Sequence, residues 1–148
     1  MSLGKTPPIR VLLADADHTF RKMRSQLLAL EDDLDIVAEV ASGAEVLGLA
    51  QLHAPDVTVL TSPLPGCDEL ALATELRAQV PSCAVVILGS SEGASLSDAL
   101  AAGAQAMLLK EAPGQRLIRA IRAVHAGHRY VDQESVADAV TRDNRATS

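Results

Sequence analysis

Short apolar runs and amphipathic segments alternate along this chain. Five runs of four to six mostly aliphatic residues are typical of strands buried on both faces; they span residues 9–14, 36–40, 57–60, 84–88 and 106–109. After each run, apolar residues return at three- and four-residue steps, the period of a helix with one apolar face. These sets are Phe20, Met23, Leu27 and Leu30; Val46, Leu47 and Ala50; Leu72, Ala73, Leu76 and Val80; Leu96, Ala99, Leu100 and Gly103; and Leu117, Ile118, Ile121 and Val124. The pattern predicts five strands alternating with five helices.

Strands and helices that alternate in this way predict an α/β fold: a doubly wound parallel sheet with right-handed crossovers and helices on both faces. Ser42 and Glu45 have the spacing of a capping box at the start of the second helix. Ligands of such sheets bind beyond the carboxyl ends of the strands. We therefore look for functional residues at 15–18, 61–65 and 89–91 and at Lys110.

Composition narrows the possible functions. Phe20 and Tyr130 are the only aromatic residues besides histidine, so we expect an aliphatic core and do not expect binding by stacking on nucleic-acid bases. The net charge of −6 argues against a DNA- or membrane-surface-binding module. Cys67 and Cys83 lack metal-ligand spacing and are expected to be free thiols in a reducing cytoplasm. Without an apolar run of about 20 residues or a signal peptide, we expect a cytoplasmic protein.

Several stretches follow one another in the order and spacing of a known family. They are Val11-Leu12-Leu13-Ala14-Asp15, Pro55-Asp56-Val57, Pro65-Gly66-Cys67-Asp68, Ala102-Gly103-Ala104, Leu108-Leu109-Lys110, and residues 118–124 followed by Gly127. In these stretches the chain resembles the receiver domain of response regulators, in particular the LuxR-type (NarL/FixJ-like) branch. The resemblance implies a flavodoxin-like receiver fold over residues 9–128. Residues 129–148 would be a linker or mobile tail, with the helix-turn-helix DNA-binding domain absent from this chain.

The resemblance also implies a metal site that this chain has only in part. In the family, two carboxylates after the first strand and an aspartate ending the third strand hold Mg²⁺. Asp15 matches the first acidic position, but Ala16 replaces the second metal carboxylate. Asp17 follows one place later and cannot fully substitute, because adjacent strand-end residues point in different directions. We expect no Mg²⁺ or weak binding at Asp15 and Asp17, and no other cofactor.

The phosphorylation site implied by the resemblance is also incomplete. Thr61 stands at the phosphoacceptor position. A threonine hydroxyl does not replace an aspartate nucleophile without a base, so we do not expect it to be phosphorylated. Gly89 stands at the hydroxyl position after the fourth strand, or Leu88 does if the next loop has kept its length. Met107 replaces the aromatic residue that often moves in the fifth strand. Lys110 is kept.

Lys110 has two interpretations. We expect an ion pair with Asp15 or Asp17, and the alternative is a lysine that binds an anion. Arg116, Arg119 and Arg122 recur every three residues, as on a solvated helix face; the resemblance implies a partner surface there, formed by the fourth helix, fifth strand and fifth helix.

The leading hypothesis is a pseudo-receiver, a two-component-type regulator domain that acts on transcription through protein contact or dimerisation and is not an enzyme. DNA would be bound only through a domain not in this chain. One alternative is an atypical receiver still competent in phosphotransfer. Another is a receiver that senses a ligand in the vacated pocket.

Overall fold

The computed structural model describes residues 6–90 and 95–131. In that part, one parallel sheet has the strand order β2-β1-β3-β4-β5-β6. The strands are β1 (Ile9–Ala14), β2 (Leu34–Val40), β3 (Val57–Thr61), β4 (Ala84–Gly89), β5 (Ala106–Leu109) and β6 (Tyr130–Val131). The helices are α1 (His18–Ala29), α2 (Val46–His53), α3 (Glu69–Gln79), α4 (Leu96–Ala101) and α5 (Gly114–His125), and the short 3₁₀ helix η1 (Gly43–Glu45) precedes α2. The predicted parallel α/β fold is confirmed.

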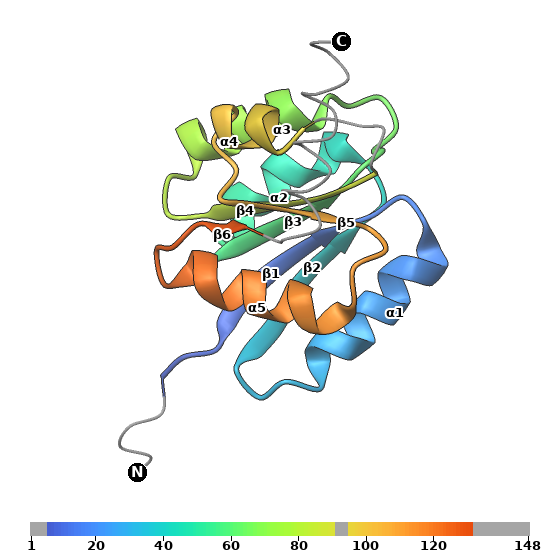
Figure 1. Cartoon of the computed structure of the whole chain (residues 1–148), viewed down its shortest axis with the longest axis vertical. Helices are drawn as coiled ribbons and strands as arrows, with labels where there is room; N and C mark the ends of the chain where they lie inside the picture. The colour runs from blue at the N-terminus through green and yellow to red at the C-terminus, as the bar shows by residue number, and fades with distance from the viewer. Residues whose placement is uncertain (1–5, 91–94, 132–148) are drawn as a thin grey trace, which may run out of the picture.

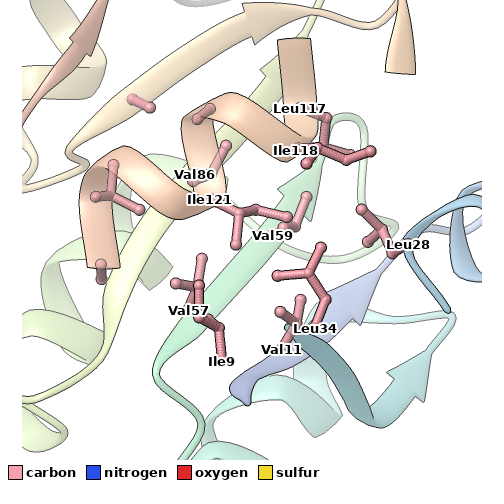
Figure 2. Packing of buried hydrophobic residues seen from close by; sticks show 14 of the residues in the cluster. Ile9, Val11, Leu28, Leu34, Val57, Val59, Val86, Leu117, Ile118 and Ile121 are labelled. Carbon is pink, nitrogen blue, oxygen red and sulfur yellow. The ribbon is translucent and has the colours of Figure 1, made fainter. Parts of the chain in front are cut away.

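The sheet lies between two helical layers (Figure 1). Helices α1 and α5 cover one face, and α2, α3 and α4 cover the other. Alternate residues of β3 point to opposite faces: Val57 and Val59 pack on the α1–α5 side, and Leu60 on the other. Figure 2 shows Ile118 and Ile121 of α5 packed against these valines. Each of these two isoleucines is fully buried and contributes about 1.5–3 kcal/mol by leaving water.

Helix α1 differs from its prediction. Phe20, Met23 and Leu30 were expected on its apolar face, but they are 51%, 56% and 77% exposed. The helix instead turns Leu28 into the core, and Arg21 and Arg24 lie on the same side at the i, i+3, i+7 spacing. Both arginines bind groups at the end of β1, which explains why a polar stripe faces inward. Of the four residues predicted for the apolar face, Leu27 packs against the core as predicted, and the prediction is wrong for the other three.

Two further local predictions need correction. Ser42 makes no side-chain capping bond, because residues 43–45 form the 3₁₀ turn η1 and do not begin α2 directly. A capping box does occur at α4, between Ser95 and Asp98. The sequence had also placed Tyr130 and Val131 in the tail, whereas they pair with β5 as a short sixth strand, with Tyr130 opposite Ala106. The rest of that predicted tail, from residue 132, and Ser91 lie outside the described residues.

No helix of the described ranges is long and apolar enough to cross a membrane.

Candidate functional site

A cavity of about 450 Å³ opens at the carboxyl ends of the central strands. Ala14 of β1 lies opposite Leu60 of β3, so the next residues along each strand, Asp15 and Thr61, come out at the same edge of the sheet. The loop after β5 supplies the third side. The cavity is lined by Asp15, Ala16, Asp17, Phe20, Arg24, Thr61, Ser62, Pro63, Lys110 and Glu111. The structure thus brings together the candidates Asp15, Asp17, Thr61 and Lys110, which come from three separate parts of the sequence.

Asp15 is 4% exposed, and both of its carboxylate oxygens have protein partners. Oδ1 accepts a hydrogen bond from the Asp17 backbone N–H at 2.8 Å. Oδ2 forms an ion pair with Nη1 of Arg24 at 2.5 Å. The Asp15 backbone carbonyl accepts a bond from Arg21 at 2.6 Å. A cationic guanidinium therefore neutralises the one acidic side chain buried in this cavity.

Arg24 also joins two loops. Its Nη2 donates to the backbone carbonyl of Lys110 at 3.3 Å, which ties α1 to the segment after β5. The guanidinium lies over the ring of Phe20, 5.6 Å from the ring centre. Sequence reasoning missed Arg24. The available signal was its position three residues after Arg21, on the helix face that begins next to Asp15.

Asp17 is the N-cap of α1. Its Oδ1 accepts a hydrogen bond from the backbone N–H of Phe20 at 3.1 Å, a role typical of aspartate at this position. Asp17 is exposed, and its neighbour Ala16 offers no oxygen from its side chain. Asp17 thus holds the start of α1 at the lining of the cavity.

Thr61 is the last residue of β3 and is 4% exposed. By the two-residue alternation of the strand, its side chain lies on the same face as Val57 and Val59. Its Oγ1 is buried and has no hydrogen-bond partner among the described residues. Leaving a buried hydroxyl unpaired costs about 1–3 kcal/mol.

The residues present do not fit Mg²⁺. This ion requires several oxygen ligands in near-octahedral geometry. Asp15 is already paired with Arg24, Ala16 contributes no side-chain oxygen, and Thr61 is neutral. Across residues 6–90 and 95–131, no group of three or more His, Cys, Asp or Glu side chains could hold a metal ion.

Lys110 follows β5 directly, and its backbone N–H donates to the Gly89 carbonyl at 2.9 Å. The expected ion pair with Asp15 or Asp17 is wrong, because Arg24 has taken the place at Asp15. Within the part of the chain that the structure describes, the Lys110 ammonium has no ion pair. It is a half-buried cation at the wall of the cavity.

Gly89 and Met107 lie apart from this cavity. They line a smaller hollow of about 120 Å³ together with Ser62, Asp68 and Glu69. A Cβ atom at position 89 would lie 2.9 Å from the terminal methyl of Met107. The methionine therefore fills space beside Gly89 that a hydroxyl-bearing residue would need.

Among the three arginines of α5, Arg122 is engaged within the chain. It binds Asp33 through two hydrogen bonds of 2.8 Å and pairs with Glu31, also at 2.8 Å. The hydrogen bonds from Arg122 lower the pKa of Asp33. Arg119 is exposed, and Arg116 is half-buried with an interaction of its own.

The family match and the sequence relatives of this chain all point to response regulators. Residues 11–122 match the family described as response regulator receiver domain. The chain is 32% identical over 130 residues to the DNA-binding transcriptional activator DevR/DosR of Mycobacterium tuberculosis, covering 87% of this chain and 60% of that protein. It is 29% identical over 140 residues to the transcriptional regulatory protein DesR of Bacillus subtilis, covering 94% of this chain and 69% of that protein. The chain thus spans about three fifths of the length of DevR/DosR.

Solved structures agree with the sequence matches. The signal receiver domain of NarL from Mycobacterium tuberculosis superposes with a TM-score of 0.77 at 26% identity, over 83% of this chain and 100% of that one. The response regulator ChrA of a heme-sensing two-component system gives a TM-score of 0.78 at 30% identity, over 93% of this chain and 66% of that one.

Proposed function

The chain belongs to the response regulator receiver family, with LuxR-type relatives, and from this premise we propose that it is a pseudo-receiver. It would pass a signal on by protein contact, without Mg²⁺-dependent phosphorylation of an aspartate. The coarser assignment, a receiver domain of a two-component regulator, follows from the family match over residues 11–122.

One observation carries the proposal: the Asp15 carboxylate is held by the guanidinium of Arg24, and β3 ends in the hydroxyl of Thr61. A receiver that transfers phosphate needs a free acidic pair for the metal and a carboxylate nucleophile, as the family resemblance implies. A threonine hydroxyl needs a general base to attack phosphorus. Asp15 is the one buried carboxylate in the cavity lining, and its ion pair with Arg24 opposes that role.

The test is incubation of the purified chain with acetyl phosphate and MgCl₂, followed by intact-mass spectrometry. We expect no mass gain, either in the wild-type protein or in Thr61→Ala. A gain of one phosphoryl group in the wild type that is absent from Thr61→Ala would establish an atypical phosphotransfer-competent receiver and reject the pseudo-receiver.

We further propose that the contact surface is formed by α4, β5 and α5, and that a second copy of the chain binds there. Exposed side chains of both signs support this placement, Arg119 on α5 and Asp98 on α4. Light scattering at increasing protein concentration tests the proposal. Arg119→Glu should weaken association, while Lys22→Glu on α1 serves as the charge-matched control. Equal association of the two variants, or a monomer throughout, would remove α5 from the interface.

We place any contact with DNA outside the receiver. The chain has a net charge of −6, and a DNA-binding surface requires clustered positive charge. DevR/DosR, named as a DNA-binding transcriptional activator, extends beyond the region that this chain matches. The similarity to DevR/DosR supports a regulator of transcription that binds DNA through a domain other than the receiver.

A further inference from the structure

We propose that the cavity between Asp15, Thr61 and Lys110 binds a small organic carboxylate: a single negative charge on an apolar, preferably aromatic, body. The inference rests on the proposed function, because it uses a cavity that is free for a ligand only if Mg²⁺ and a phosphoryl group do not occupy it. It names the chemical class that such a receiver would sense.

The cavity has the dimensions of a ligand site. Its volume of about 450 Å³ falls in the range of about 300–1,000 Å³ that small-molecule pockets occupy. A buried cavity of roughly 150 Å³ already accommodates benzene. The space therefore suits a molecule with one ring and a short substituent, and it is much larger than a single phosphate needs.

Two groups form the polar end of the site. The ammonium of Lys110 supplies a cation with three donor hydrogens and has no ion pair among the described residues. The hydroxyl of Thr61 is buried at the same cavity and lacks a hydrogen-bond partner in the described ranges. A carboxylate would accept from the ammonium of Lys110 and, after a change of the Thr61 rotamer that brings Oγ1 to the cavity, from the hydroxyl. It would neutralise the lysine and pair the hydroxyl, two costs that the ligand-free protein carries.

The charges of the lining limit the ligand to one negative charge. Asp15 and Arg24 neutralise each other, so Lys110 is the remaining cation of the lining. Asp17 and Glu111 stand at the rim with their own negative charges. A second negative charge on the ligand would meet these carboxylates without a compensating cation, which disfavours a phosphate dianion.

The rest of the wall suits an apolar body. Phe20 of α1 and Pro63, which follows β3, both line the cavity. Phe20 remains 51% exposed in a chain that buries most of its apolar side chains, and the guanidinium of Arg24 lies over its ring. A ligand ring placed between Phe20 and Pro63 would cover this exposed aromatic surface.

Phenylacetate is the probe for the experiment. The 148-residue chain labelled with ¹⁵N is titrated at pH 7, and amide shifts are followed by NMR. Saturable shifts are expected at Ala16, Ser62 and Lys110, with a dissociation constant on the order of 1 mM, the usual range for a ligand of about ten non-hydrogen atoms. Two comparison probes are 2-phenylethanol, which keeps the ring but has no charge, and inorganic phosphate, which has charge but no ring.

Variants separate the contributions. Lys110→Met keeps the stem but removes the charge and should weaken phenylacetate binding about tenfold, the effect of losing a charge-assisted hydrogen bond. Thr61→Val should weaken it about threefold or more while leaving the fold intact, because the hydroxyl it removes has no partner among the described residues. Lys22→Met is the matched control: Lys22 lies outside the cavity beside Glu39, and its variant should bind as the wild type does.

Specific results would overturn the inference. These are an absence of saturable shifts up to about ten times the expected dissociation constant, equal binding by Lys110→Met and wild type, or tighter binding of phosphate or 2-phenylethanol than of phenylacetate. Any of them with no phosphoryl mass gain would reject the carboxylate site and leave the pseudo-receiver standing. A phosphoryl gain at Thr61 would reject the proposed function itself.

Discussion

The ion pair between Asp15 and Arg24 offers the sharpest test of the site. Replacing Arg24 with methionine keeps an unbranched apolar stem beside Phe20 and removes the guanidinium. The side chains of Asp15 and Arg24 are 5% and 15% exposed, so the variant leaves a buried carboxylate without its counter-charge. Such a loss costs roughly 3–5 kcal/mol. We take about 3 kcal/mol, the low end of that range, because Asp15 keeps the bond from the Asp17 N–H.

Urea and thermal unfolding followed by circular dichroism measure this cost, since the chain has no tryptophan for fluorescence. A loss of about 3 kcal/mol corresponds to a fall in Tm of about 6–12 °C for a chain of this size. Lys22→Met, which removes an exposed ion pair with Glu39, should cost less than about 1 kcal/mol.

A double-mutant cycle isolates the interaction. Asp15→Asn and Arg24→Met combined should be about 2 kcal/mol more stable than the sum of the single losses predicts. A coupling energy near zero, or a cost for Arg24→Met no greater than for Lys22→Met, would refute the inference that this arginine neutralises the site.

Three further predictions follow from other parts of the molecule. Arg122 lowers the pKa of Asp33, so the ion pair stabilises the folded state above pH 3.8, the ordinary pKa of the group, and this stabilisation is lost as pH falls through the lowered pKa. Wild type should therefore be more stable than Asp33→Asn near neutral pH, by under about 1 kcal/mol for so exposed a pair, and urea unfolding should show this difference closing in acid. A difference that widens in acid would contradict the prediction. Gly103→Ala should cost about 1 kcal/mol or more in urea unfolding, because φ is 102° and the new Cβ would lie 2.8 Å from Cγ of Arg77; unchanged stability would count against the strain. Burial raises the pKa of the Cys83 thiol, so iodoacetamide should modify it only on unfolding, and rapid labelling in the native protein, seen by peptide mapping, would show that the residue is accessible.

The fold was predictable from the sequence because most helices and strands form by burying their apolar residues, and the spacing of those residues shows which element they form. The core stripes of α3 and α5 were read correctly, since every apolar residue assigned to them is buried, including Leu76 and Ile118. Helix α1 was not, because a tertiary interaction overrides its apolar pattern: Arg24 faces Asp15, and Phe20 is left exposed. Periodicity alone does not reveal an inward-facing charged stripe.

The candidate site was predictable in part. Strand ends identified Asp15, Thr61 and Lys110 as neighbours, since residues at the same edge of a parallel sheet meet. The partner of Asp15 was not predictable, because the side chains of Lys110 and Arg24 are both positively charged. Only the folded structure shows which of them reaches the carboxylate. The short strand at Tyr130 was also missed, since two residues are too few to give a periodic signal.

The guanidinium of Arg24 is covalently part of the chain, whereas a metal ion such as Mg²⁺ binds from solution and can dissociate. The guanidinium of Arg24 is delivered to Asp15 by helix α1, at a local concentration that the fold sets and no buffer changes. Chelators cannot remove it, and fluctuations in cellular magnesium do not alter its occupancy. The carboxylate at the end of β1 thus has a counter-charge that the fold itself supplies.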